Sequence, residues 1–364
     1  MSQVSTPLIP APGDPVAPSD TGGSPAHILG VVSGARRAQV VLAAAELDLF
    51  TVLADRDLAA AEIGAAIGLH PEWTRDFLDA VASSGLIIAD GGRYSNSPDA
   101  HRYLVRGRPE YLGGFLRFLD KTLHPAWTGL AASVKSGKPV NSDAAEGDPY
   151  GVLFTDPDDR RGFFDAMDVL NAPIGAALAR LDWSQRGTFA DIGGARGNIA
   201  ASLVRAHPHL RATVFDLPEV ESEFDSHIGE LGLKDRIEFR PGDFFTDPLP
   251  SAEVLIFGHV LHNWPVARRR QLIEAAYAAL PDGGTIAIYD PVIDPARPSP
   301  SALLASLNML VWSSGGSEYT VAEAETWLRD AGFVDIAAAP LGPTSTLITG
   351  ERPRHGRSTA EIAR

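Results

Sequence analysis

One stretch, residues 188–217, constrains the fold of this chain more than any other. It reads TFADIGGARGNIAASLVRAHPHLRATVFDL: an apolar run ending at Asp191, a glycine cluster, a helical pattern, and a β-branched run ending at Asp216. A strand, a glycine turn, a helix and a second strand with a terminal acid are typical of the nucleotide-binding half of a doubly wound α/β sheet. We therefore predict a parallel sheet with a nucleoside-containing cofactor at this turn.

The chemistry of the turn agrees with such a ligand. Glycines let the backbone approach a ligand closely, and the first N–H groups of a helix have no partner within it. The carboxylate of Asp216 is placed to accept from both hydroxyls of a ribose. The pyrophosphate spacing G-x-G-x-x-G is absent, which disfavours nicotinamide and flavin dinucleotides. An ordinary tight turn between a strand and a helix is the alternative interpretation.

Length and composition restrict the class of protein further. The chain has 364 residues, 45% of them hydrophobic, which predicts two domains with ample cores. It contains no cysteine, which excludes disulfides, thiolate metal sites and a cysteine nucleophile. A formal net charge of −15 argues against nucleic acid as a partner. No long apolar run or signal-like N-terminus is present, so we expect a cytoplasmic protein without a membrane span.

The N-terminal part of the chain predicts an arm followed by a winged helix. Residues 1–25 are rich in Pro, Ala, Ser and Gly, and we expect them to be disordered. Residues 26–104 carry helical patterns and then IIADGGRYSNS, which reads as a two-stranded wing with its turn at Gly91 and Gly92.

The winged helix is not expected to bind DNA. We expect Asp57 to cap its second helix, and the second and third helices set four acids against a single arginine: Glu62, Glu72, Asp76 and Asp79. Such a face would not dock on phosphates. We predict packing or dimerisation instead.

The rest of the chain divides into a helical region and a sheet. Residues 105–180 are helical and rich in aromatic side chains, most of which we expect in the core. From 181 to 350 strands and helices alternate, but the last two apolar runs lie too close together for a helix between them. The sheet should therefore end with an antiparallel strand. Residues 351–364 read as a solvated tail.

Ligand-binding residues are expected beyond the carboxyl ends of the strands. After the third strand, Asp243 can bond an exocyclic amine while Phe244 stacks on a purine; a helix cap beside a core aromatic is the alternative. After the fourth strand, GHVLHNW contains His259 and His262.

His262 is the candidate general base. Asp290, after the fifth strand, and Glu318 are acids that can flank it, and carboxylates beside an imidazole fix its tautomer and favour the imidazolium. Two histidines can also bind a metal, but no clear third ligand is present, so we expect no metal.

Four motifs in combination resemble the caffeate and hydroxyindole O-methyltransferase family, which uses S-adenosylmethionine. They are GDFF, GHVLHNWP, the PDGG turn before IAIYDP, and GGSEYT. The resemblance covers about residues 26–350. It implies an α/β, Rossmann-like methyltransferase domain behind an N-terminal, mostly helical winged-helix dimerisation domain. It also implies a homodimer whose partner subunit contributes to the substrate pocket.

The resemblance implies roles for particular residues. His262 would be the base, and Asp290 and Glu318 the acids that hold it. Cofactor contacts are expected from the strand ends, namely Asp191, Gly193, Gly194, Asp216, Leu217, Asp243, Phe244, Gly258 and His259. Contacts with an aromatic substrate are expected from two helical regions, namely Trp127, Phe163, Met167, Asn308 and Met309.

Two positions depart from the family pattern. Ala195 stands where the family usually has a third consecutive glycine, and the turn would be altered if that position needs a positive φ. Asn263 follows the histidine where the family often has Asp, and we expect it to weaken the neighbouring hydrogen bonds.

The resemblance implies transfer of a methyl group from S-adenosylmethionine to the hydroxyl of a small aromatic substrate, in secondary metabolism, and the chemistry agrees with it. The displacement at a sulfonium destroys charge, so a water-poor site favours it, and a phenol with a pKa of about 10 needs a base nearby. C-methylation of a phenolic ring and a non-methylating, cofactor-binding role remain alternatives within the family. A ligand-binding winged-helix regulator and a nicotinamide oxidoreductase are alternatives outside it.

Overall fold

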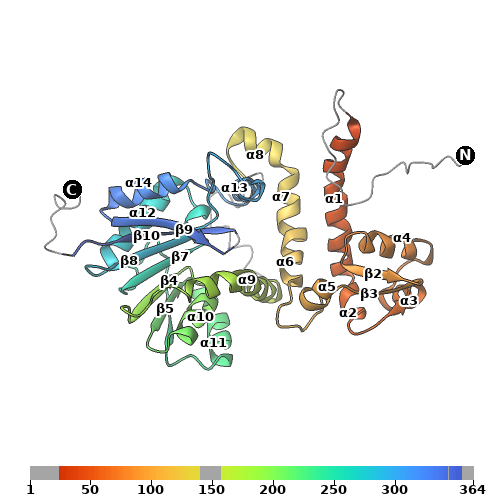
Figure 1. The fold of residues 1–364 in the computed structure, drawn as a ribbon, viewed down its shortest axis with the longest axis horizontal. Helices are drawn as coiled ribbons and strands as arrows, with labels where there is room; N and C mark the ends of the chain where they lie inside the picture. The colour runs from red at the N-terminus through yellow and green to blue at the C-terminus, as the bar shows by residue number, and fades with distance from the viewer. Residues whose placement is uncertain (1–23, 140–156, 343, 355–364) are drawn as a thin grey trace, which may run out of the picture. The chain divides into compact units, whose positions relative to one another are not determined.

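The computed structural model describes residues 24–139, 157–342 and 344–354 of the chain. The predicted arm and tail lie almost wholly outside these residues. The chain divides into two units, Met1–Arg117 and Phe118–Arg364, and each is described by itself (Figure 1). The finer division at residues 104 and 180 remains a prediction.

The first unit is helical with a three-stranded antiparallel sheet in the order β1-β3-β2. Its elements are α1 (Pro25–Glu46), α2 (Leu49–Val52), β1 (Leu58–Ala59), α3 (Ala60–Ile67), α4 (Pro71–Ala82), β2 (Ile87–Asp90), β3 (Arg93–Asn96) and α5 (Pro98–Tyr103). Gly91 and Gly92, both with positive φ, close the hairpin between β2 and β3, as the sequence predicts. Buried side chains including Phe50, Ile63 and Leu78 form its core.

Asp57 does not cap the second helix. The helix α3 begins at Ala60, and Asp57 Oδ1 instead accepts a hydrogen bond of 3.0 Å from Arg93 Nε in the wing. Glu62, in the first turn of α3, accepts from the backbone N–H of Ala59 at 2.7 Å. Asp57 therefore binds the wing, and Glu62 stabilises the start of α3.

Helix α1 leaves an apolar face uncovered within its unit. Ile28, Leu29, Val31 and Val32 are between 61% and 67% exposed. Among the described residues, α1 is also the helix that is long and apolar enough to cross a membrane, judged by length and composition alone.

The second unit is a seven-stranded sheet with helices on both faces. Its helices are η1 (Leu119–Leu123), α7 (His124–Thr128), α8 (Leu130–Ser136), α9 (Pro157–Leu178), α10 (Asn198–Ala206), η3 (Pro218–Val220), α11 (Glu221–Glu230), η4 (Leu261–Asn263), α12 (Val266–Ala279), α13 (Pro300–Trp312) and α14 (Val321–Ala331). Its strands are β4 (Thr188–Ile192), β5 (Arg211–Asp216), β6 (Ile237–Pro241), β7 (Val254–Gly258), β8 (Thr285–Asp290), β9 (Val334–Leu341) and β10 (Ser345–Glu351). Helix α6 (Gly113–Phe118) spans the boundary between the two units.

The strand order is β6-β5-β4-β7-β8-β10-β9. Strands β4 to β8 are parallel, and β10 runs antiparallel between β8 and β9, as the sequence predicts. The chain builds outward from β4 to β6 and then returns to the other side of β4 at β7. In open α/β sheets ligands bind beyond the carboxyl ends of the strands at such a switch point, which here lies between β4 and β7.

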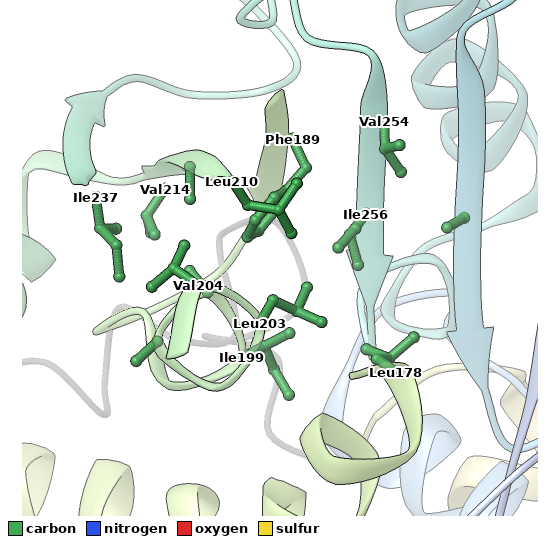
Figure 2. Close-up of a cluster of buried hydrophobic side chains, with 14 of the residues drawn as sticks. Leu178, Phe189, Ile199, Leu203, Val204, Leu210, Val214, Ile237, Val254 and Ile256 are labelled. Carbon is green, nitrogen blue, oxygen red and sulfur yellow. The ribbon is translucent and has the colours of Figure 1, made fainter. Parts of the chain in front are cut away.

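Apolar side chains cover both faces of the sheet. On one face, α9, α10 and α11 pack on the strands, and Figure 2 shows Ile199, Leu203 and Val204 of α10 gathered with strand residues such as Val214 and Ile256. On the other face, α12 and α14 contribute Leu272, Ile273 and Trp327. Both faces of the strands are buried, which explains why β7 reads as the continuous apolar run VLIF.

Gly258, at the end of β7, is a glycine because the ring of Tyr289 occupies its side-chain space. The two residues are paired across β7 and β8, and a Cβ on Gly258 would lie 2.0 Å from both Cζ and Oη of Tyr289. Tyr289 is buried, so its ring has no room to retreat. The packing at this end of β7 and β8 thus requires glycine at position 258 as long as tyrosine occupies position 289.

We predict that Gly258→Ala lowers the free energy of unfolding by about 1–3 kcal/mol, because it overpacks this contact. In a Tyr289→Leu background the same change should cost clearly less. Thermal unfolding of the four proteins of this cycle measures the coupling. Equal losses in both backgrounds would show that the contact does not constrain position 258.

Candidate functional site

The glycine turn after β4 adopts the left-handed conformation at three residues: Gly193 (φ 69°), Ala195 (φ 47°) and Gly197 (φ 84°). Ala195 therefore takes the positive φ that a glycine would adopt at less cost. Its backbone N–H donates to Asp216 Oδ2 at 2.8 Å, which offsets the strain. Position 195 thus has the positive φ for which the sequence predicts an altered turn, and a non-glycine residue adopts it here.

Asp191 lies under this turn as a buried acid. Its side chain packs against Gly194, where a Cβ would lie 2.6 Å from Asp191 Cγ, so only glycine fits there. Asp191 Oδ2 is buried and has no hydrogen-bond partner among the described residues. Burial, helped by the nearby charge of Asp216, raises the pKa of Asp191 to about 7. Such a group can satisfy a cationic or hydrogen-donating ligand.

Asp216 is held by the backbone at the end of β5. Its Oδ2 accepts from Ala195 N–H and its Oδ1 from Leu217 N–H, at 2.8 and 2.7 Å. Each carboxylate oxygen has further lone pairs, so the side chain can still accept from a pair of hydroxyls.

Asp243 and Phe244 follow β6 at the same edge of the sheet. Asp243 Oδ1 accepts from Phe245 N–H at 2.8 Å, which fixes the loop. The ring of Phe244 reaches the glycine turn, because its Cε1 lies 3.8 Å from the position of a Cβ on Gly193. It also meets the rings of Phe245 and Trp264 edge to face. The four predicted groups, Asp191, Asp216, Phe244 and the turn, are thus gathered at the ends of β4, β5 and β6.

His262 lies in the short helix η4 after β7 and forms a buried hydrogen bond with Glu318. The distance from His262 Nδ1 to Glu318 Oε1 is 2.9 Å. A carboxylate only accepts, so Nδ1 carries the proton. The other ring nitrogen, Nε2, makes no hydrogen bond to any part of the chain that the structure describes, and it retains the lone pair. His262 is therefore oriented as a base.

Asp290 is the second acid beside His262. Its Oδ1 lies 3.8 Å from Nδ1 of both His262 and His259, and its Oδ2 accepts from the Tyr319 hydroxyl at 2.7 Å. Burial raises the pKa of Asp290 to about 6, although His262 opposes the shift. Burial alone would lower the pKa of His262, but Asp290 and Glu318 outweigh it and raise that pKa. The predicted trio is brought together.

His259 has a different environment from His262. Its φ of 53° is left-handed, and its ring meets the ring of Tyr289 edge to face at 5.2 Å. Burial and the neighbouring His262 lower the pKa of His259 to about 3, so this imidazole is neutral. Side-chain nitrogen or oxygen atoms of His259, His262 and Asp290 lie within 4.8 Å of one another, so the sheet brings all three predicted residues to one place.

Asn263 makes a hydrogen bond of its own beside His262, and its predicted effect on the neighbouring hydrogen bonds stays a prediction. It is buried, and its Nδ2 donates to the carbonyl of His259 at 2.8 Å. An ionised carboxylate could not donate this bond. The amide thus connects the end of η4 to His259, which lies two residues before that helix and has a left-handed φ.

The residues predicted to contact the substrate meet in part. Trp127 Nε1 on α7 donates to Asn308 Oδ1 on α13 at 3.0 Å, although the two are 181 positions apart. Phe163 on α9 packs against Phe118, and Phe118 against Trp312 on α13, each edge to face. Met167 and Met309 lie on the same two helices, α9 and α13.

The sequence did not single out several residues of this neighbourhood. Tyr319, in the GGSEYT motif, holds Asp290, and Trp312 extends the aromatic group. Arg269 is buried and its charge acts on Asp290 and Glu318, and only the run of three arginines at 268–270 gave a signal for it.

Comparison with known proteins places the chain in a family. Residues 127–334 match the O-methyltransferase domain, and residues 29–106 match the O-methyltransferase dimerisation domain. The chain belongs to the O-methyltransferase family. It is an S-adenosylmethionine-dependent methyltransferase with the predicted fold class, a dimerisation domain followed by an α/β methyltransferase domain.

Individual relatives match this chain over most of its length. It is 44% identical to the tetracenomycin polyketide synthesis 8-O-methyl transferase TcmO of Streptomyces glaucescens, over 91% of this chain and 97% of that one. It is 38% identical to the N,N-dimethyltransferase OxyT of Streptomyces rimosus, over 84% and 90%. The structure of human N-acetylserotonin methyltransferase in complex with SAM superposes with a TM-score of 0.83 at 28% identity, over 92% and 99%.

We predict that Asp216→Ala weakens binding of S-adenosylhomocysteine by about 1–3 kcal/mol, roughly 5- to 150-fold in Kd, because it removes a half-buried acceptor and releases two backbone N–H groups. Isothermal titration calorimetry measures the change. Asp225→Ala is the matched control, since Asp225 is an exposed acid paired with Lys234 on the same domain. Equal affinities for the two variants would contradict the role of Asp216.

Proposed function

We propose that this enzyme methylates the hydroxyl of a phenolic substrate in secondary metabolism, with His262 as the general base. One observation carries the proposal: His262 Nδ1 is engaged by Glu318, so Nε2 is left to accept a proton. A phenol, with a pKa of about 10, is a weak nucleophile at neutral pH unless its proton is removed during attack.

The residues divide the work of the reaction. S-adenosylmethionine supplies an electrophilic methyl group on a sulfonium. With the cofactor bound, the phenol proton would pass to His262 Nε2 as the phenol oxygen takes the methyl group, and the cofactor would leave as a neutral thioether. The imidazolium that forms is stabilised by Glu318 and Asp290. Burial of this trio keeps water away and strengthens that stabilisation.

We assign the cofactor to the ends of the parallel strands. Asp216 would accept from the ribose hydroxyls, Asp243 and Phe244 would hold the adenine, and the turn with Asp191 would face the positively charged amino-acid end. The full set is Asp191, Gly193, Gly194, Asp216, Leu217, Asp243, Phe244, Gly258 and His259. The donor and acceptor groups fit this cofactor, because the carboxylates face a ligand that carries a sulfonium and an ammonium.

The acceptor is proposed to be a planar aromatic molecule. The relative TcmO is named for 8-O-methyl transfer in polyketide synthesis, and aromatic side chains are gathered on α7, α9 and α13 of this chain. Substrate contacts are assigned to Trp127, Phe163, Met167, Asn308 and Met309. The relative OxyT is named an N,N-dimethyltransferase, so an amine acceptor is the second candidate. An amine with a free lone pair would depend less on His262. Methylated products of a mixed phenol and amine library, identified by mass spectrometry, separate the two.

We predict that His262→Ala lowers kcat on a phenol of ordinary acidity by about 10²–10⁴, the usual contribution of a positioned acid–base group. Binding of S-adenosylhomocysteine should stay nearly unchanged. Glu318→Gln and Asp290→Asn should cost less, because these acids orient the base and do not accept the phenol proton. Wild-type turnover by the alanine variant on such a phenol would contradict the assignment.

We also predict that kcat rises with pH. The base works when neutral, and Asp290 and Glu318 raise the pKa of His262 above its ordinary value of 6.5. Activity should therefore be low below that pKa and increase as pH passes through it. Because the pKa of Asp290 is about 6, the acidic side of the kcat–pH profile reflects the titration of His262 and Asp290 together. In Glu318→Gln this side of the profile should move to lower pH, and an unchanged position would contradict this account.

We propose, in addition, that the enzyme is a cytoplasmic homodimer joined through residues 26–104, with no metal, nucleic acid or membrane as partner. The dimerisation-domain match and the exposed apolar face of α1 support the homodimer. Leu29→Glu with Val32→Glu should give a monomer, since each buries a charge in the interface. Sedimentation equilibrium should show twice the chain mass for the wild type. A wild-type monomer, or flotation with lipid vesicles, would contradict the proposal.

A further inference from the structure

Three consecutive arginines lie near the start of helix α12, and they have different surroundings. Arg268 lies over the ring of Phe245, and Arg270 pairs with Asp330 at 2.6 Å on the surface. Arg269 turns inward and is only 1% exposed, which makes it one of the largest fully buried side chains. A buried guanidinium is costly unless its donors are used, so its partners are informative.

Arg269 ties together the two segments that carry His262 and Glu318. Its Nε donates to the carbonyl of Trp264 at 2.6 Å, two residues after His262. Its Nη2 donates to the carbonyl and the hydroxyl of Ser317, the residue before Glu318, at 2.6 and 2.9 Å. Ser317 N–H in turn donates to the carbonyl of His262 at 2.9 Å. The histidine segment and the glutamate segment are therefore held at two points beside the His262–Glu318 bond.

The guanidinium of Arg269 also packs against Tyr319, the residue that holds Asp290. Arg269 Cζ lies 5.0 Å from the centre of the Tyr319 ring and 5.4 Å from that of Trp327. The hydroxyl of Tyr319 is the donor to Asp290. Across the described parts of the chain, no carboxylate lies within the 4.0 Å of an ion pair with Arg269. Its charge is therefore not neutralised by a single acid and acts on Asp290, Glu318 and Glu323.

We propose that Arg269 is a positioning residue for the methyl transfer: it locks the segments of His262 and Glu318 together and supplies the fixed positive charge that balances the two buried acids. The proposal rests on the proposed role of His262 as the base. It assigns no contact between Arg269 and either substrate.

The charges around His262 give the proposal a measurable sign. Asp290 from β8 and Glu318 from the loop before α14 raise the pKa of His262, while Arg269 from α12 lowers it. His259 from the end of β7 faces the same groups but stays neutral. Tyr319 is neutral as well, since burial raises its pKa well above the ordinary value. Removing Arg269 should therefore leave the acids to bind the His262 proton more tightly.

The test compares Arg269→Met, Arg269→Lys and the matched control Arg270→Met in the full-length enzyme. Histidine labelled with ¹³C reports the pKa of His262 by NMR, with its signal assigned by loss in His262→Gln. In Arg269→Met we expect that pKa to rise and kcat at pH 7 to fall about 10- to 100-fold. Part of the kcat should return at higher pH, and the Kd for S-adenosylhomocysteine should stay within about twofold. Arg269→Lys keeps the charge but not the fork, so the His262 pKa should shift less while kcat still falls. Arg270→Met should match the wild type.

Two results would overturn the proposal. One is a folded Arg269→Met whose His262 titration and kcat–pH profile superimpose on those of Arg270→Met. The other is loss of folding in both Arg269 variants, which would make the arginine a requirement of the fold and not of the site. The NMR titration does not depend on turnover. If His262→Ala kept full activity, the role of His262 as base would fail, and the titration would still show whether Arg269 controls its charge.

Discussion

The site depends on two buried carboxylates beside one imidazole. The side chains of Asp290 and Glu318 are fully buried, and burying unpaired charges costs several kcal/mol each. The chain offsets this cost with specific partners. The His262 ring binds Glu318, the Tyr319 hydroxyl donates to Asp290, and the positive charge of Arg269 acts on both acids. The same partners fix the tautomer of His262, so the demand for electrostatic balance and the demand for a base are met by one arrangement.

The sheet topology brings these groups together from distant parts of the chain. His262 follows β7 and Asp290 ends β8. Glu318 lies in the loop before α14, and 56 positions separate it from His262 in the sequence. Adjacent parallel strands end at the same edge, so β7 and β8 deliver a histidine and an acid side by side. The glutamate comes from a loop, and a loop needs an anchor to hold a charged group within hydrogen-bond distance. The bonds from Arg269 to Ser317 and Trp264 provide one.

Much of this could be predicted from the sequence, for physical reasons. Strands buried on both faces read as apolar runs, the glycine turn marks the switch from strand to helix, and the short spacing between the last two runs predicts the antiparallel end. What failed were matters of side-chain direction and contact. Sequence alone does not tell which of three arginines turns inward, that Tyr289 fills the space of Gly258, or that Asn263 donates to His259. Likewise, the left-handed φ of Ala195 is stabilised by Asp216, which lies 21 residues away.

The central claim is that Glu318 holds the proton on Nδ1 of His262 and leaves Nε2 as the base. The most direct measurement is ¹⁵N NMR of ring-labelled histidine in the enzyme with S-adenosylhomocysteine, at a pH above the pKa of His262. The account predicts a single tautomer for His262, with a protonated Nδ1 and a bare Nε2, and a mixture of tautomers in Glu318→Gln. A wild-type enzyme in which His262 carries its proton on Nε2 would contradict it.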